Sequence, residues 1–519
     1  MTHVGMSEYE WLRYWARARP DQEAVVFEGR RITYAELQRR VERLASGFRA
    51  ALGLASGDRI AILSSNRPEF LESMFAASAA GLVFVPINYF QSAPEILALV
   101  EHCDPAAVIV DSTVAAQVRG GTLAPALEGR QTVWLGQPDG PGHAFEDLIA
   151  GGHPGHPGVV VDRSDVAMIC YTSGTTGRPR GAVVTHEAIF WSASGVAAAQ
   201  DLTSRDRIIM VLPLCFVAGA VALPGQALLR GATLVLEQGF DPEQAIHRID
   251  SERISVLWAV TSQWPRLLEV PKAPEILSAL RLAFIGAQPV PLDLLLRLVD
   301  MGIAINQGYG FTENCAGGSV VPPERSIEKC GSIGLPYLGS EMAVLDEAGR
   351  ELPTGEVGEL CFRSPSAMRE YWQDPEQTAE AFRFGWLHTG DLARFDDDGF
   401  AFLVERKKDV IISGGINVFP AEVEAAILTL PQVAEVTVIG LADDRWGEAV
   451  TAVVVPKPDA SPSVNDIIEP CNQLLARYKV PKQVIFQREP LPRTPGGKVL
   501  KRVVREQLSA AAVANGKAD

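Results

Sequence analysis

Short apolar runs rich in β-branched residues alternate with longer amphipathic stretches over most of residues 1–330. A short apolar run bounded by turn residues is typical of a buried strand, and apolar positions three or four apart are typical of a helix. The pattern predicts strands at residues 59–63, 83–87, 107–111, 208–212, 233–236, 256–260 and 283–285. It predicts helices at residues 68–80, 242–251 and 291–298. This alternation predicts parallel sheets with helices on both faces.

The pattern changes near residue 334, where short alternating strands and turns replace the helical stretches. After residue 406 a new mixture begins, with predicted helices at 420–429, at 465–477 and from 501 onward, and predicted strands at 435–439 and 449–455. The expected fold class is therefore α/β. A large N-terminal domain of parallel sheets (1–407) includes a small β-rich subdomain (332–404), and a small α+β domain follows (408–519).

Two segments break the alternation. Residues 136–158 are rich in Gly, Pro and His and are expected to form a surface connector. Residues 208–229 carry no charge, but prolines and glycines interrupt them, so they are expected to form a buried strand and loop and not a membrane span.

Composition narrows the function classes. The chain has 519 residues, of which 47% are hydrophobic and 21% charged, as in globular proteins. Its net charge of −16 argues against a nucleic-acid partner. Seven scattered cysteines without a Cys-x-x-Cys pair fit reduced thiols, and Glu8 and Glu10 stand where a signal peptide needs apolar residues. We expect a cytoplasmic protein; the sequence predicts no oligomeric state.

The clearest local signal is YTSGTTGRPRG at residues 171–181, directly after an apolar run. Glycine allows a ligand to approach the backbone closely, and N–H groups and hydroxyls bind phosphate oxygens. The spacing does not match a Walker A loop. The alternative is an ordinary Ser/Thr/Gly turn.

The second signal is QGYGFTE at residues 307–313. Tyr309 can stack on a base, Thr312 can donate to a phosphate, and Glu313 can hold a hard cation such as Mg²⁺. The alternative is a strand end with a core tyrosine and a solvated glutamate.

These two motifs resemble those of the AMP-forming acyl-CoA synthetases, members of the ANL superfamily of adenylate-forming enzymes. The first resembles YTSGTTGxPKG but has Arg180 where lysine is usual, and the second matches QGYGxTE in full. By resemblance, Gly286-Ala287-Gln288-Pro289 forms the turn around the adenine. The resemblance extends over about residues 20–506, with all five of its motifs in order.

The resemblance assigns the other three motifs as well. Asp391, in GWLHTGDL, has two acceptor oxygens that can bind vicinal ribose hydroxyls, although a single such aspartate is usually a turn residue. By resemblance, Arg406 also reaches the ribose and Lys408 is the hinge between domains. Gly414 and Gly415 line the channel for the pantetheine of CoA. Lys498, in LPRTPGGK, bridges the substrate carboxylate and the α-phosphate.

The resemblance implies two reactions at one site, with a mobile C-terminal domain. ATP and Mg²⁺ activate a carboxylic acid to acyl-AMP with release of pyrophosphate, and CoA then takes the acyl group. Lys498, Thr312 and Glu313 are the expected catalytic residues, with Glu313 also the metal ligand. The expected residues that bind ATP or AMP are Thr172, Ser173, Gly174, Thr175, Thr176, Gly177, Ala287, Gln288, Pro289, Tyr309, Asp391 and Arg406.

The acid is less defined. Phe216 stands where the family often has histidine, and no Asp or Glu occurs between Asp206 and Glu237 to pair with an amine. An uncharged acyl or aryl acid is therefore expected. The candidates for its pocket, each of which can also be ordinary core, are Phe216, Trp258, Ile285, Gly310 and Cys315.

Two alternative functions remain open at this point. The enzyme can instead load the acyl group onto the thiol of a separate carrier protein, since no carrier-like domain follows residue 506. A non-catalytic nucleotide-binding homologue is the alternative of another class, and the intact Thr312, Glu313, Asp391 and Lys498 weigh against it.

Overall fold

A computed structural model describes residues 6–119, 121–155, 158–172, 179–413, 416–443, 445–493, 497 and 499–515. The chain divides into two compact units. Unit 1 comprises Met1–Met342 and Phe362–Leu387, and unit 2 comprises Ala343–Cys361 and His388–Asp519. The expected domain boundary at residue 407 stays a prediction.

The first sheet of unit 1 is mostly parallel. Its order is β19-β9-β8-β4-β3-β5-β6-β7. The strands are β3 (Arg59–Leu63), β4 (Val83–Pro86), β5 (Ala107–Asp111), β6 (Gln131–Leu135), β7 (His143–Ala144), β8 (Val166–Thr172), β9 (Arg180–Thr185) and β19 (Glu370–Tyr371). Strand β9 runs antiparallel to both β8 and β19, so the sheet ends in a hairpin with one added short strand.

The second sheet of unit 1 contains, in order, β2-β1-β11-β10-β12-β13-β14-β15-β16. The strands are β1 (Glu23–Phe27), β2 (Arg30–Thr33), β10 (Arg207–Met210), β11 (Thr233–Leu236), β12 (Val256–Val260), β13 (Leu282–Gly286), β14 (Ala304–Gly310), β15 (Gly318–Val321) and β16 (Ser332–Pro336). Neighbouring strands are parallel in the part of this sheet that extends from β1 to β14. Strand β2 is antiparallel to β1, β15 is antiparallel to β14, and β16 is antiparallel to β15.

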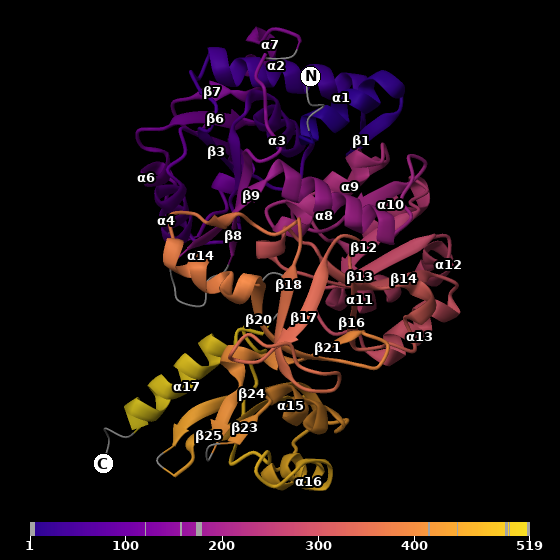
Figure 1. The fold of residues 1–519 in the computed structure, drawn as a ribbon, viewed down its shortest axis with the longest axis vertical. Coiled ribbons are helices and arrows are strands. Elements are labelled where there is room, and N and C mark those ends of the chain that lie inside the picture. The colour runs from indigo at the N-terminus through magenta and orange to yellow at the C-terminus, as the bar shows by residue number, and fades with distance from the viewer. Residues whose placement is uncertain are drawn as a thin grey trace. The chain divides into compact units, whose positions relative to one another are not determined.

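Helices cover both faces of each sheet, as the alternation predicts (Figure 1). A central layer between the sheets contains α1 (Glu8–Ala18), α2 (Tyr34–Ala50), α3 (Pro68–Ala80), α8 (His186–Ala199) and α9 (Leu223–Leu229). The outer layers contain α4 (Ala93–Cys103), α5 (Ser112–Ala115) and α6 (Ala124–Leu127) on the first sheet, and α10 (Pro242–Ser251), α11 (Trp264–Leu268), α12 (Ala273–Leu277) and α13 (Leu292–Asp300) on the second. Along β3, Ile60 and Ile62 face the central layer, whereas Ala61 and Leu63 face the outer one. Alternate residues thus build separate cores.

Two sequence predictions are wrong in part. The expected connector at 136–158 contains β7 and the helix α7 (Phe145–Gly151), whose Phe145, Leu148 and Ile149 are buried. The expected strand and loop at 208–229 contains β10, then a π-helical turn at Ala218–Ala222 and α9. Pro224 follows the π-helical turn, and the backbone is helical at both Ala222 and Leu223, so this proline does not break the helix.

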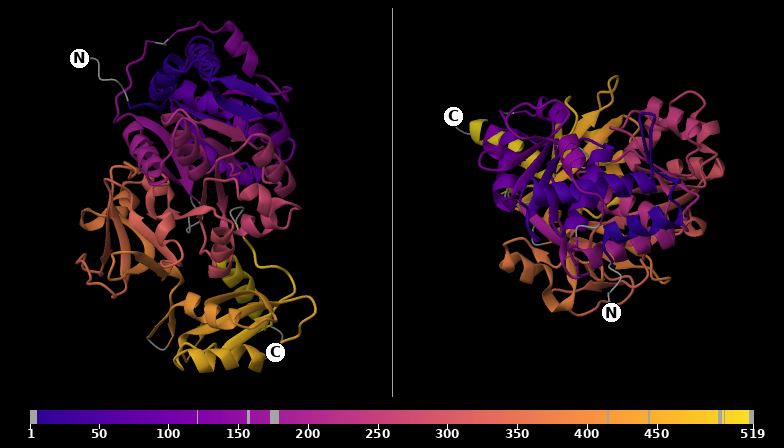
Figure 2. Two further views of the ribbon diagram at one scale, coloured as in Figure 1. Left: turned by 90° about the vertical axis from the view of Figure 1, so that its right-hand side faces the viewer. Right: turned by 90° about the horizontal axis from the view of Figure 1, so that it is seen from above.

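Unit 2 contains two sheets. One has the order β17 (Glu341–Leu345), β18 (Gly358–Arg363), β20 (Leu387–Phe395) and β21 (Ala401–Arg406). The other contains β22 (Ile411–Ser413), β23 (Ile416–Val418), β24 (Val433–Asp443), β25 (Gly447–Pro456) and β26 (Gln483–Phe486). On this second sheet α15 (Pro420–Leu428) and α16 (Val464–Leu474) cover one face, and α17 (Lys501–Asn515) covers the other (Figure 2).

No helix within the described ranges combines the length and hydrophobicity that a membrane span requires.

Candidate functional site

The predicted phosphate loop is carried by the β8–β9 hairpin of unit 1. Thr172 pairs with Arg180 and Tyr171 with Gly181, so the two ends of the loop are adjacent. A Cβ on Gly181 would lie 2.7 Å from Cγ2 of Ile169, so the close packing here requires glycine. Of the loop residues, Ser173, Gly174, Thr175, Thr176 and Gly177 lie outside the described residues.

The two motifs predicted to surround the adenine lie on adjacent parallel strands, where Gly286 at the end of β13 pairs with Gly308 of β14. Ala287 follows with a φ of +68°, a backbone conformation that L-residues rarely adopt outside functional or tight turns. Ala287 and Pro289 are exposed, Gln288 is half-buried, and the carbonyl of Gln288 accepts a hydrogen bond from Oγ1 of Thr261 at 3.1 Å. Neighbouring strands thus hold this turn beside the Gly-Tyr-Gly segment.

Tyr309 continues β14 and lies in a small aromatic cluster. Its ring is nearly parallel to that of Phe362, with an interplanar angle of 15° and centroids 6.2 Å apart, and it lies 5.9 Å from the ring of Phe311. Phe362 is fully buried, so this cluster fixes the orientation of Tyr309.

Glu313 lies in a 3-10 turn, Thr312–Asn314, that follows β14, and two bonds tie it to residues 368–371. Its backbone carbonyl accepts from N–H of Met368 at 2.7 Å, and its Oε1 accepts from the hydroxyl of Tyr371 at 2.7 Å. Tyr371 pairs with Ala182 of β9, so Glu313 lies beside the hairpin that carries the phosphate loop. Burial and the adjacent Glu313 carboxylate raise the pKa of Tyr371 well above its usual value, so this phenol remains a donor.

In unit 2 the two predicted ribose ligands meet. Asp391 of β20 pairs with Arg406 of β21, and Nε of Arg406 lies 2.6 Å from Oδ1 of Asp391. The Asp391 side chain is 6% exposed and the Arg406 side chain 37%. The guanidinium is thus the more accessible partner of a buried carboxylate.

The predicted hinge residue, Lys408, lies two positions after Arg406. Burial lowers the pKa of Lys408. The preceding Lys407 reaches back to Glu359, with Nζ 3.0 Å from Oε2, and Glu359 also lies 3.2 Å from Nδ1 of His388. Burial acts to raise the pKa of Glu359, but hydrogen bonds with His388 and Lys407 outweigh it and lower this pKa to about 2.

Lys498, Gly414 and Gly415 lie outside the described residues, but their surroundings are described. Ser413 pairs with Ile416 across the two glycines. Arg493 forms an antiparallel bridge with Val499, and its Nη1 donates to the carbonyl of Gly497 at 2.8 Å. The described residues that flank each segment are therefore adjacent to one another.

The structure separates the acyl-pocket candidates. Trp258 is 4% exposed, stacks on Phe284 with centroids 3.9 Å apart, and faces the central helical layer. Ile285 is fully buried and faces the opposite side of the same sheet, among the outer helices. The two residues do not line one space.

Of the other three candidates, only Cys315 belongs to the buried core of the central layer. Cys315 is fully buried, with a φ of +54°, and its carbonyl accepts from Oγ of Ser192 at 2.7 Å. A Cβ on Gly310 would lie 2.4 Å from the carbonyl oxygen of Ala316, so Gly310 permits a close turn of its own chain. Phe216 is half-buried.

Sequence reasoning did not find Tyr89, Phe90 or Tyr371. The Phe216 ring lies parallel to that of Phe90, within 7° and with centroids 6.3 Å apart, and Phe90 stacks on Tyr89 at 4.3 Å. Tyr371 is 58 positions from Glu313. No local pattern marks these residues, because strand pairing and loop packing bring them to their partners.

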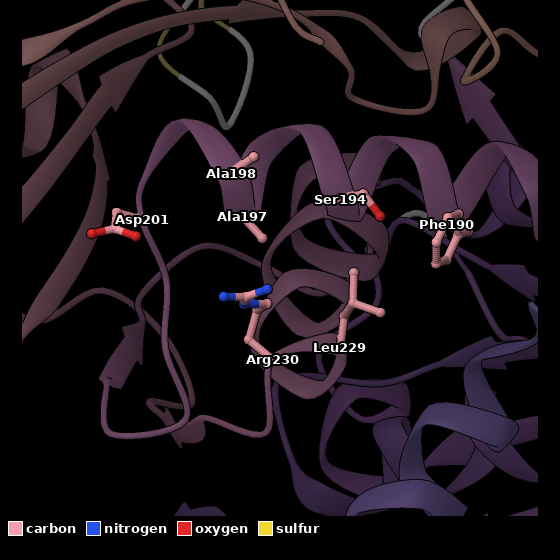
Figure 3. A pocket seen from close by; sticks show the side chains of 7 residues that line it. All are labelled: Phe190, Ser194, Ala197, Ala198, Asp201, Leu229 and Arg230. Carbon is pink, nitrogen blue, oxygen red and sulfur yellow. The ribbon is translucent and has the colours of Figure 1, made fainter. Parts of the chain in front are cut away.

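A cavity of about 420 Å³ lies elsewhere, between α8 and α9 (Figure 3). Its lining residues are Phe190, Ser194, Ala197, Ala198, Asp201, Leu229 and Arg230. None of them belongs to the nucleotide motifs.

The residues present fit Mg²⁺ carried by ATP. Within the described ranges, no group of three or more His, Cys, Asp or Glu side chains is placed to hold a metal ion by itself. Magnesium in phosphate-binding sites is commonly held by one or two carboxylates together with substrate phosphates and water. Glu313 lies beside the β8–β9 hairpin and is a carboxylate that would hold Mg²⁺ in this way.

Comparison with known proteins gives the family. The sequence model described as AMP-binding enzyme matches residues 12–372, and that described as AMP-binding enzyme C-terminal domain matches residues 422–498. A feruloyl-CoA synthase from an Amycolatopsis species is 40% identical over 499 residues, covering 95% of this chain and 97% of the relative. The long-chain-fatty-acid–CoA ligase FadD13 of Mycobacterium tuberculosis is 37% identical over 481 residues, covering 92% and 94%.

A solved structure extends this likeness to the fold. O-succinylbenzoate coenzyme A synthetase from Bacillus subtilis, in complex with ATP and magnesium ion, aligns with a TM-score of 0.84 at 30% identity, covering 96% of this chain and 99% of that one. This chain belongs to the AMP-binding enzyme family and is an AMP-forming acyl-CoA synthetase of the ANL superfamily.

Proposed function

We propose that this acid–CoA ligase acts on a carboxylic acid whose acyl or aryl group carries no charge. We also propose that one adenylate site, built from the five motifs, serves both of its reactions. The carboxylate oxygen of the acid attacks the α-phosphorus of ATP, the bond to pyrophosphate breaks, and acyl-AMP forms. The sulfur of CoA then attacks the acyl carbon, and AMP leaves. The observation that carries this proposal is the attachment of Glu313 to the hairpin of the phosphate loop, through Met368 and Tyr371.

Charge is the main obstacle to the first reaction, because a carboxylate and a polyphosphate repel each other. The residues 172–177 hold the pyrophosphate through hydroxyls and backbone N–H groups, and Thr312 donates to a phosphate oxygen. Mg²⁺ held by Glu313 would supply positive charge at the phosphate oxygens. Lys498 neutralises the charge that accumulates where the acid and the α-phosphate meet.

The nucleoside is held by the remaining residues of the motifs. The turn of Ala287, Gln288 and Pro289 contacts the adenine, and Tyr309 stacks against it from a fixed orientation. Asp391 accepts hydrogen bonds from the ribose hydroxyls. Its contact with Arg406 supports a shared role, since the arginine both orients the carboxylate and can itself donate to the ribose.

The second reaction requires Lys498 to withdraw and Gly414 and Gly415 to approach the thioester site. We propose that the C-terminal domain reorients about Lys408 between the two reactions. The flanking residues support this proposal: Ser413 pairs with Ile416 and Arg493 with Val499, and both pairs belong to unit 2.

An acid with a flat ring fits the features of the acyl site best. Phe216 lies parallel to Phe90, and Phe90 stacks on Tyr89, so aromatic rings gather where the family often places a histidine. The feruloyl-CoA synthase among the relatives is named for such an acid. We therefore assign acid selection to Phe216 and its neighbours Tyr89 and Phe90. Ile285 is not included, because it faces the opposite side of its sheet.

The proposal is tested by pyrophosphate release with a panel of aryl and aliphatic acids, followed by mass analysis of the acylated thiol. The expected result is release with uncharged aryl acids and formation of the CoA thioester. Transfer only to the thiol of a carrier protein would refute CoA as the acceptor. Absence of release with every acid would refute an adenylating activity.

We place the reaction in the cytoplasm, where ATP and CoA are both supplied. Location of the tagged chain in cell fractions tests this placement, and recovery outside the cytoplasmic fraction would contradict it.

A further inference from the structure

Residues 368–372 join the turn of Glu313 to the strand that leaves the phosphate loop. N–H of Met368 donates to the carbonyl of Glu313 at 2.7 Å. Four residues later, N–H of Trp372 donates to the carbonyl of Gly181 at 2.7 Å, next to the start of β9. A segment bonded at both ends in this way fixes the spacing between the metal carboxylate and the base of the loop.

Tyr371 is the side chain of this segment that contacts Glu313. Its hydroxyl donates to Oε1 of Glu313 at 2.7 Å, and the residue is 7% exposed. N–H of Tyr371 donates to Oγ1 of Thr378 at 2.9 Å, which anchors the backbone at the same position. A buried phenol held in this way can restrict a carboxylate to one orientation.

Arg180 approaches the same ring from the end of the phosphate loop. Its guanidinium carbon lies 5.9 Å from the centroid of the Tyr371 ring, within the range of a cation–π contact. This is the position where the chain departs from the lysine usual in the family. A planar guanidinium stacks on an aromatic ring in a way that a compact ammonium group does not.

We propose that Tyr371 is a positioning residue of the MgATP site: its hydroxyl holds one oxygen of Glu313, so that the carboxylate presents the other oxygen to the metal, while its ring carries Arg180. The inference rests on the proposed function in one respect, that Glu313 binds the metal. Partners that orient a metal ligand commonly contribute 10- to 100-fold to metal affinity.

The test is calorimetric binding of ATP without acid, so that no turnover occurs, in Mg²⁺ and in EDTA. The ratio of the two dissociation constants measures the contribution of the metal. We expect Tyr371→Phe to reduce this ratio about ten-fold and to leave the affinity for AMP, which lacks the β- and γ-phosphates, within about two-fold of wild type. Arg180→Lys is expected to reduce the ratio only about two- to five-fold.

Tyr34→Phe is the matched control. The hydroxyl of Tyr34 is also buried and donates to a backbone carbonyl, that of Ala232, at 2.7 Å. This variant loses a buried tyrosine hydrogen bond elsewhere in unit 1, and we expect it to keep the wild-type ratio. Thermal unfolding of every variant confirms that the binding data come from folded protein.

Glu313→Gln separates this inference from the proposed function. It should abolish most of the Mg²⁺ effect, and adding Tyr371→Phe to it should cause no further loss. If Glu313→Gln keeps the wild-type ratio, the metal assignment of the proposed function is wrong. If Glu313→Gln loses the Mg²⁺ effect but Tyr371→Phe keeps it, the positioning role is wrong and the metal assignment stands. The same conclusion follows if Tyr371→Phe weakens AMP binding as much as it weakens MgATP binding.

Discussion

Gly308→Ala tests whether the Gly-Tyr-Gly segment is built around a stacked pair of aromatic rings. A Cβ at Gly308 would lie 1.9 Å from Cζ and 2.4 Å from Cε2 of Phe284. Carbon atoms pack at about 3.5–4.0 Å, so the ring would have to withdraw by about 1.6–2.1 Å. Phe284 stacks on Trp258 at 3.9 Å and 11°, so this withdrawal breaks the stack.

The expected loss of stability follows from these two effects. Overpacking of a core costs about 1–3 kcal/mol. Loss of a stacked aromatic pair costs about 0.5–1.5 kcal/mol more. We therefore expect the free energy of unfolding of unit 1 to fall by about 2–4 kcal/mol. AMP binding should weaken as well, because Tyr309 follows Gly308 directly.

Urea unfolding followed by tryptophan fluorescence measures the first effect, and calorimetric AMP binding measures the second. Gly239→Ala is the control, since a Cβ at this exposed glycine would meet no atom within 4 Å. Replacing a glycine without strain usually stabilises a protein slightly. If Gly308→Ala changes stability no more than Gly239→Ala does, the packing argument is wrong.

Three further predictions concern unit 2 and the acid site. Asp391→Asn should weaken AMP binding at least about ten-fold, because a buried charged acceptor is lost beside Arg406, and unchanged calorimetric affinity would contradict this. Glu359→Gln should lower stability at neutral pH by about 1–3 kcal/mol, because the charge-assisted contacts with Lys407 and His388 are weakened and solvent screens part of their energy. The lowered pKa means that this contribution is present above the unfolded value of 4.5 and is lost as pH falls towards about 2, so urea midpoints of the two proteins should converge in acid. Phe216→Ala should raise KM for aryl acids more than KM for ATP, and equal changes in steady-state kinetics would contradict acid selection.

Much of the fold was predictable because its strands and helices carry clear patterns. The β-branched run at β5 is buried throughout and forms a parallel strand, as expected. The segment from β10 to α9 carries no such pattern. Its residues are buried on all sides, so hydrophobic residues show no helical periodicity. Pro224 also suggests the end of a helix, although it lies in the first turn of α9.

Contacts between predicted site residues could be anticipated where the motifs lie on neighbouring strands, although their roles stay predictions. Asp391 and Arg406 come from two motifs, and the pairing of β20 with β21 brings them into contact. The arrangement of the acyl-pocket candidates was not predictable in this way. Trp258 pairs with Phe284, so the next residue, Ile285, faces the opposite side of the sheet. This alternation depends on the register between strands, which a single sequence does not define.

The role of Lys498 provides the most direct test of the account, because both reactions are assigned to one site and only the first is assigned to this lysine. Acid-dependent pyrophosphate release and CoA thioester formation from supplied acyl-AMP are measured separately on Lys498→Ala. We predict that pyrophosphate release falls by about two to three orders of magnitude, while thioester formation stays within a few-fold of wild type. Equal loss of both reactions would contradict the account.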